Sequence, residues 1–148
     1  MTGGQNGHFG ALKTVNILIL DPEPTCRAAR QSLFMLAGHR AETVADGNQA
    51  LAILRRRRFD ILLFDPLSND ATAMPLLPLA RLTCPGCRLV ILTKTNLFQR
   101  GELFGMMPPA IRIVRQPVSD ADLVIHCEHA VSRNAPARKP GVREAYQH

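Results

Sequence analysis

The chain has few aromatic side chains, with no tryptophan, one tyrosine and an aromatic content of 5% over 148 residues. Proteins that bind nucleic acids often interleave aromatic rings, on which bases stack, with basic residues. The formal net charge of +6 is not arranged in that way, because much of it lies in a run of arginines at residues 55–58 and in a basic segment after residue 132. We therefore do not expect a nucleic-acid partner.

Long hydrophobic runs are also missing. A membrane-spanning helix needs roughly 20 consecutive apolar residues, and no run approaches that length. A secretory signal has a basic region followed by an apolar one. The glycine-rich start of the chain lacks this pattern. The content of 46% hydrophobic and 20% charged residues is typical of a globular protein. We expect a soluble, cytoplasmic chain with no membrane partner.

Cysteine is scarce, at four residues, and without a secretory route we expect all four to be reduced. Cys84 and Cys87 have the spacing of a redox motif, but such a motif opens a helix after a strand, whereas this pair precedes an apolar run. No second ligand pair with zinc spacing accompanies them. We therefore expect neither redox nor zinc chemistry there.

Apolar, β-prone runs alternate with segments of helical periodicity five times along the chain. This alternation predicts an α/β domain, a three-layer sandwich in which helices cover both faces of a five-stranded parallel sheet. The third expected helix has a proline in its first turn, where proline is tolerated, and a second one at Pro78. The fourth expected helix is poorly defined. The expected strands are residues 15–20, 41–44, 59–64, 88–92 and 111–114, and the expected helices are 25–37, 47–58, 75–82, 97–107 and a last helix capped by Ser119 and ending near 131.

Local patterns add detail to this fold. The first helix should bury its positions Ala29, Leu33, Leu36 and Ala37, which recur at three- and four-residue steps. The four arginines Arg55, Arg56, Arg57 and Arg58 should form the last turn of the second helix, where positive charge is favourable against the helix dipole. We expect one domain over residues 15–131, between a flexible N-terminal segment (1–14) and a disordered basic tail (132–148).

Polar residues stand at the ends of three expected strands. Asp21, Asp65 and Thr93 each come directly after a buried apolar run. The carboxyl ends of parallel strands share one edge of the sheet, which is where doubly wound folds gather functional side chains. We therefore expect these three residues to lie together.

With the turn at Asp46-Gly47 and with Pro117 after the last strand, this order resembles the receiver domain of bacterial response regulators, over roughly residues 15–131. The resemblance implies a doubly wound, flavodoxin-like fold with strand order 2-1-3-4-5. It also implies two-component phosphorelay signalling, in which Asp65 is the phosphoacceptor, Asp21 belongs to the acidic pocket and Thr93 is the switch hydroxyl. In that family magnesium assists the phosphoryl transfer, so Asp21 and Asp65 are the candidate metal ligands.

The chain departs from the pattern of this family around Asp65. The second acidic ligand is replaced by Pro22, and recruiting Glu23 in its place would require a distorted loop. Gln116 stands in the position of the family lysine and brings no charge to a phosphoryl group. Ile113 occupies the place of an aromatic switch residue. The loop that follows Asp65 also lacks the usual Met-Pro pair.

Lys94 follows the switch threonine, where the family prefers a small residue. Two placements of its side chain are open: the ammonium pairs with Asp65 and compensates for the missing metal, or it points to solvent. In either case we expect magnesium binding to be weakened or absent, and no other cofactor is implied.

These departures predict an atypical single-domain receiver that is not an enzyme and that acts mainly through protein contacts, with phosphorylation of Asp65 impaired or absent. The resemblance implies a histidine kinase or a downstream effector as partner, or a homodimer, through the fourth helix, fifth strand and fifth helix. Near this face the chain has the large apolar residues Phe98, Phe104, Met106 and Met107.

Two alternatives remain open. One is a working phosphoacceptor that reacts at Asp65 with low efficiency and still uses magnesium. The other is a sensor that binds a cyclic dinucleotide through Arg55, Arg56, Arg57 and Arg58 or through the arginines of the tail, since arginine makes bidentate contacts with phosphate.

Overall fold

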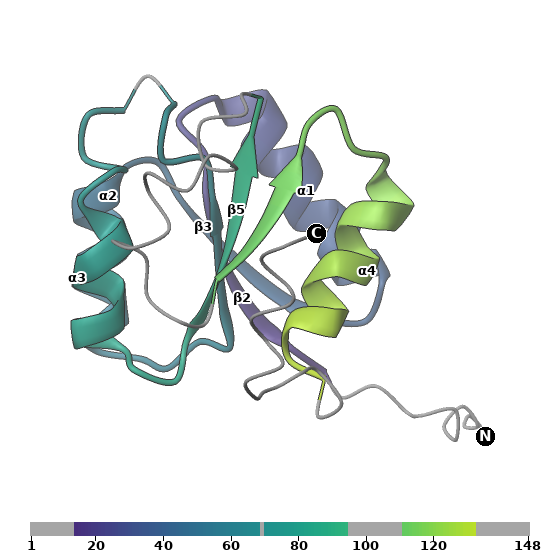
Figure 1. Ribbon diagram of the computed structural model, residues 1–148. Coiled ribbons are helices and arrows are strands. Elements are labelled where there is room, and N and C mark those ends of the chain that lie inside the picture. Colours follow the sequence, from purple (N-terminus) through teal and green to yellow (C-terminus); the bar gives the residue numbers. More distant parts are fainter. Residues whose placement is uncertain (1–13, 69, 95–110, 133–148) are drawn as a thin grey trace, which may run out of the picture.

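A computed structural model describes residues 14–68, 70–94 and 111–132. Within these residues, five parallel strands form one sheet in the order β3-β2-β4-β5-β6. Numbered along the chain from the first of them, this is the order 2-1-3-4-5, so the predicted fold class is confirmed (Figure 1). The elements are β2 (Asn16–Leu20), α1 (Pro24–Leu36), β3 (Arg40–Val44), α2 (Gly47–Leu54), β4 (Ile61–Phe64), α3 (Leu76–Thr83), β5 (Arg88–Thr93), β6 (Ile111–Arg115) and α4 (Asp120–Ala130).

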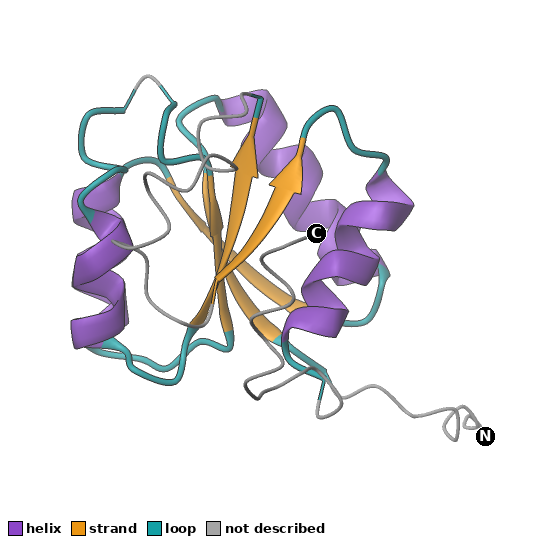
Figure 2. Cartoon of the chain, viewed as in Figure 1, coloured by secondary structure: helices purple, strands orange, loops and turns teal. Residues whose placement is uncertain are grey.

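The helices cover both faces of the sheet, with α2 and α3 on one side and α1 and α4 on the other (Figure 2). Successive residues of a strand point to opposite faces, and β2 divides its residues accordingly. Leu18 and Leu20 belong to the core beneath α2 and α3, whereas Ile17 and Ile19 belong to the core beneath α1 and α4. The near-continuous apolar run of β2 is thus explained by burial on both faces.

The buried face of α1 differs from the predicted one. Phe34 is fully buried and Leu33 packs partly against the same core, but Leu36 is 88% exposed, and Ala29 and Ala37 are exposed as well. The prediction counted small and apolar positions together. Phe34 has the largest apolar surface among the candidates, so its burial sets the orientation of the helix.

The arginine run also lies elsewhere than predicted. Helix α2 ends at Leu54 with Arg55 as its C-cap, so Arg56, Arg57 and Arg58 form the connection to β4 rather than a last helical turn. All four arginines are exposed. The connection at the amino-terminal edge of the sheet therefore carries exposed positive charge.

The last helix agrees with its predicted pattern. The hydroxyl of Ser119 accepts a hydrogen bond from the backbone N–H of Asp122 at 3.0 Å, which caps the amino end of α4. Leu123 and Cys127 are buried on its inner face. The predicted helix at 97–107, with Phe98, Phe104, Met106 and Met107, lies outside the described residues, as do most of both terminal segments.

In the described part of the chain, no helix is both long enough and apolar enough to span a membrane.

Candidate functional site

Asp21, Asp65 and Thr93 lie at the same edge of the sheet, as predicted. Asp21 directly follows β2, Asp65 directly follows β4 and Thr93 is the last residue of β5, and these three strands are parallel neighbours. The edge is the one toward which the arrowheads point in Figure 2. The topology therefore gathers two carboxylates and a hydroxyl at the carboxyl ends of the strands.

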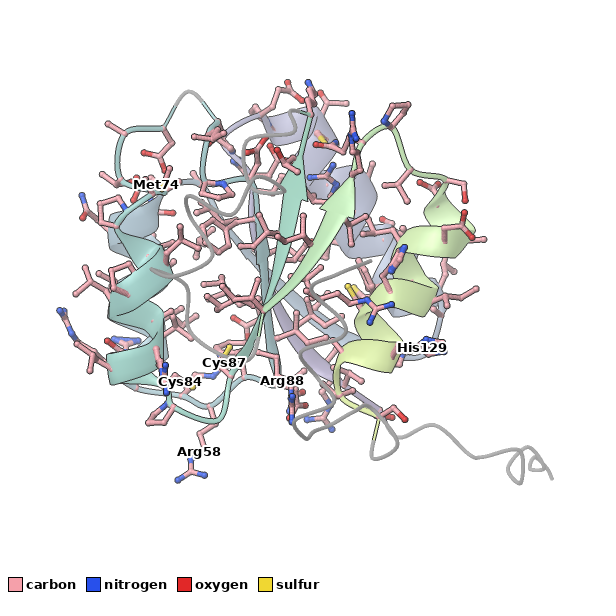
Figure 3. All side chains as sticks on the ribbon, viewed as in Figure 1. Arg58, Met74, Cys84, Cys87, Arg88 and His129 are labelled. Carbon is pink, nitrogen blue, oxygen red and sulfur yellow. The ribbon has the colours of Figure 1, made fainter. Side chains whose placement is uncertain are left out.

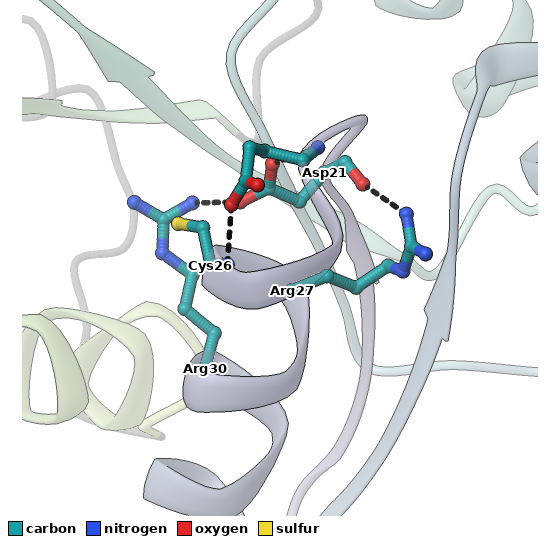
Figure 4. A network of polar contacts seen from close by, with 5 residues as sticks. Asp21, Cys26, Arg27 and Arg30 are labelled. Atoms are coloured by element: carbon teal, nitrogen blue, oxygen red, sulfur yellow. Dashed lines mark hydrogen bonds and ion pairs between the residues drawn. The ribbon is translucent and has the colours of Figure 1, made fainter.

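The carboxylate of Asp21 is already engaged by its own chain (Figure 4). Its Oδ2 lies 3.0 Å from Nη1 of Arg30 on α1, and the two side chains are only 9% and 19% exposed. Its Oδ1 accepts a hydrogen bond from the backbone N–H of Glu23 at 2.9 Å. Both oxygens of the Asp21 carboxylate thus have partners, one of them a cation.

Neighbouring groups of α1 close around the same residue. Arg27 donates from Nη1 to the backbone carbonyl of Asp21 at 2.8 Å. Burial, followed by the hydrogen bond to Asp21, raises the pKa of the Cys26 thiol, so this thiol stays protonated at neutral pH. Asp21 is therefore held by three residues from the first two turns of one helix.

The two residues that follow Asp21 are Pro22 and Glu23. Pro22 has no donor atom in its side chain. The carboxylate of Glu23 caps α1, because its Oε1 accepts the backbone N–H of Cys26 at 2.8 Å. Recruiting Glu23 to the acidic pocket would break that cap, which contributes about 1 kcal/mol in typical helices.

Asp65 is half-buried, and its Oδ1 accepts the backbone N–H of Leu67 at 2.8 Å. A local turn of this kind leaves the second carboxylate oxygen for other partners. Within residues 14–68, 70–94 and 111–132, no three histidine, cysteine, aspartate or glutamate side chains are grouped so that they could hold a metal ion. Magnesium is usually held by one or two carboxylates together with several waters in near-octahedral geometry, and the two candidate carboxylates that the strand ends bring to this edge are Asp21 and Asp65.

The remaining candidate residues lie in β5 and β6 or directly after these strands. Thr93 is completely buried, and its carbonyl accepts the backbone N–H of Gln116 at 2.8 Å. Gln116 and Ile113 are partly buried. Lys94 is exposed, and among the described residues the structure has no ion pair between it and Asp65. Lys94 therefore points to solvent, which is one of the two placements considered for it.

The loop after β4 is tied to the start of α2. The backbone N–H of Gly47 donates to Oδ2 of Asp70 at 3.0 Å and to the hydroxyl of Thr72 at 2.7 Å. Burial raises the pKa of Asp70, but its hydrogen bonds from Thr72 and Gly47 outweigh this effect and lower it. The Asp46-Gly47 turn quoted in the resemblance thus fixes the loop that carries Asp70.

Arg30 was not singled out from the sequence, and it is the main residue that sequence reasoning missed. A signal existed, because Arg27 and Arg30 are three positions apart on the helix that begins just after Asp21, so both point to one face. The predicted stripe placed the buried face of α1 elsewhere, which hid this relation.

No family model matches the chain. It is 24% identical over 119 residues to the "Probable transcriptional regulatory protein TcrX" of Mycobacterium tuberculosis, a match that covers 80% of this chain and 50% of that protein. The chain therefore spans about half the length of this curated relative.

Solved structures resemble it over most of its length. The chemotaxis protein CheY4 of Vibrio cholerae superposes with a TM-score of 0.67 at 22% identity, over 80% of this chain and 99% of that chain. A response regulator receiver domain protein from Clostridium thermocellum gives 0.68 at 22% identity, over 81% and 96%. A structure described as adenylate cyclase from Rhodopirellula baltica gives 0.70 at 17% identity, over 80% and 88%. Likenesses at this level of identity establish a common fold.

Proposed function

The chain has the fold of the response regulator receiver domains, and from that premise we propose that it acts in two-component signal transduction mainly through protein contacts, with phosphorylation of Asp65 impaired or absent. The observation that carries this proposal is the ion pair between Asp21 and Arg30. It places a fixed positive charge of the chain itself on the one acidic-pocket carboxylate that the sequence retains.

Electrostatics explains why this pairing matters. A carboxylate that already holds a guanidinium at 3.0 Å attracts a second cation less strongly, and the two cations would repel each other across a partly buried site. Pro22 offers no ligand and Glu23 is committed to the helix cap. Phosphoryl transfer to a carboxylate depends on positive charge placed around the transferred group, and Gln116 cannot supply that charge in place of a lysine.

The partner surface that we propose includes β6 and α4. On α4, Ile125 is 46% exposed, which leaves an apolar side chain open to a partner. Arg112 of β6 donates from Nε to Nδ1 of His126 at 3.1 Å. This hydrogen bond links the two elements through polar side chains, next in sequence to Ile125. A histidine kinase, a downstream effector or a second copy of the chain would contact this face. We do not propose a catalytic activity.

The test is to incubate the full chain with acetyl phosphate and Mg²⁺ and to measure its intact mass. We expect no addition of a phosphoryl group in the wild type, and the backbone amide NMR signals of β6 and α4 should stay where they are. Asp65→Asn is the control that removes the acceptor.

The outcome that would contradict the proposal is phosphorylation of the wild type that disappears in Asp65→Asn, together with shifted signals in β6 and α4. That result would establish the alternative of a working, low-efficiency phosphoacceptor.

A further inference from the structure

A cleft of about 420 Å³ lies at the amino-terminal edge of the sheet, opposite to the edge that carries Asp65. It lies where β2 and the edge strand β3 begin and where the loop from α2 enters β4. Figure 3 shows Arg58 of this loop extending from the lower end of the molecule, away from the ends of the strands where the arrowheads point. The cleft is therefore separate from the acidic pocket.

The walls of the cleft are strongly basic. Arg40, Arg57 and Arg58 line it, and Glu42 is the carboxylate that lines it with them. Arg57 forms an ion pair with Glu42. Arg40 and Arg58 are exposed, and no carboxylate of the described residues pairs with either side chain. The cleft thus keeps an excess of positive charge after its internal pairing.

Arg57 is held in place before any ligand arrives. Its guanidinium is bound to Glu42 on one side and lies over the ring of Phe59, 5.2 Å from the ring centre. Phe59 is itself only 5% exposed, so the ring beneath Arg57 belongs to the core and does not move freely. An arginine with a fixed plane loses less side-chain entropy when it makes bidentate contacts with an anion.

The cleft also has an apolar side and a histidine ring. Met35, at the end of α1, lines it and is 57% exposed, which offers a polarizable surface to a flat ring. His39 lines it as well. Its Nδ1 accepts the backbone N–H of Val15 at 3.1 Å and its Nε2 lies 2.8 Å from a carboxylate oxygen of Glu128, so both ring nitrogens already have partners.

From this combination we infer that the cleft binds a small phosphate-bearing anion of nucleotide size, with Arg40 and Arg58 contacting the phosphate and Arg57 orienting it. Pockets for small ligands begin near ~300 Å³, a size that this cleft exceeds. Arginine is the side chain best suited to bidentate phosphate contacts. Of the arginine run that suggested a cyclic dinucleotide, only Arg57 and Arg58 line the cleft.

A single-stranded nucleic acid fits the site less well, since such ligands follow an extended basic groove with several aromatic platforms. Here the charge is confined to one concave site, and the one aromatic ring that lines it is covered by Arg57. The inference goes beyond the proposed signalling function, and because the two sites lie at opposite edges of the sheet, either can fail alone.

The test is isothermal titration of the full chain with pyrophosphate, ADP, cyclic di-GMP and an oligothymidylate, at low salt and at physiological salt. The variant Arg40→Gln/Arg58→Gln removes the two arginines without carboxylate partners. Arg56→Gln/Arg81→Gln removes the same charge from two exposed arginines that do not line the cleft. Circular dichroism checks that both variants fold.

We expect pyrophosphate or a nucleotide to bind the wild type at both salt concentrations. The affinity should fall by about tenfold or more in Arg40→Gln/Arg58→Gln and by less than about twofold in the control. Tighter binding of ADP than of pyrophosphate would identify a nucleotide, and equal binding would identify the phosphate group alone as the recognised feature. Absence of binding, an equal loss in both variants, or tighter binding of the oligothymidylate than of ADP would overturn the inference.

Discussion

Removing the positive charge of Arg30 should destabilise the fold, because it leaves the Asp21 carboxylate partly buried without its cation. Arg30→Met keeps most of the side-chain stem and removes the guanidinium. Breaking a fully buried ion pair costs roughly 3–5 kcal/mol, whereas an exposed pair contributes about 0–1 kcal/mol. The side chains of this pair are 19% and 9% exposed, which places it between the two cases.

Asp21 keeps part of its environment in that variant. The backbone N–H of Glu23 still donates to Oδ1 at 2.9 Å, so the carboxylate is not left without a hydrogen bond. We therefore expect a loss of about 2 kcal/mol in the free energy of unfolding. For a chain of 148 residues this corresponds to a fall in Tm of roughly 4–8 °C.

Urea denaturation followed by circular dichroism measures this loss, and Arg81→Met, an exposed arginine of α3, is the matched control. Adding Asp21→Asn should recover most of the stability, since a neutral amide needs no counter-charge. A wild-type stability in Arg30→Met, or no recovery in Asp21→Asn/Arg30→Met, would show that the pair does not hold the pocket as argued.

Gly47→Ala should lower the free energy of unfolding by at least about 2 kcal/mol, because a Cβ there would lie 2.0 Å from the carbonyl oxygen of Thr72. Gly86→Ala is the control, since a Cβ there would have no atom within 4 Å and should change stability little. Thermal unfolding of both variants measures the difference. Burial, and then the charge of Arg112, lower the pKa of His126, so its NMR titration should have a midpoint below 6.5 that rises in Arg112→Gln; a midpoint at or above 6.5 in the wild type would contradict the described packing.

The fold could be predicted from the sequence because its strands are simple. Runs such as residues 61–64 are apolar at every position and fully buried, so no choice of face was needed. Helix α1 was harder, since Ala29 and Leu36 fit a helical period as well as Leu33 and Phe34 do. Which stripe is buried depends on the shape of the sheet beneath it, and the sequence does not contain that information locally.

The candidate site was predictable to the extent that topology determines it. Asp21, Asp65 and Thr93 had to meet once the strand order was known. The partner of Asp21 was not predictable in that way, because it depends on which face of α1 turns toward the strand end. The partner is Arg30, nine positions along the chain, on the same helix as the buried Phe34.

We propose that the ion pair of Asp21 with Arg30 and the loss of one ligand at Pro22 have removed the metal-dependent chemistry of Asp65. Calorimetric titration of Mg²⁺, alone and with beryllofluoride, on the wild type and on Asp65→Asn tests this most directly. We expect no metal-dependent binding of this phosphoryl mimic to either protein while both remain folded. Binding to the wild type that requires Mg²⁺ and disappears in Asp65→Asn would contradict it.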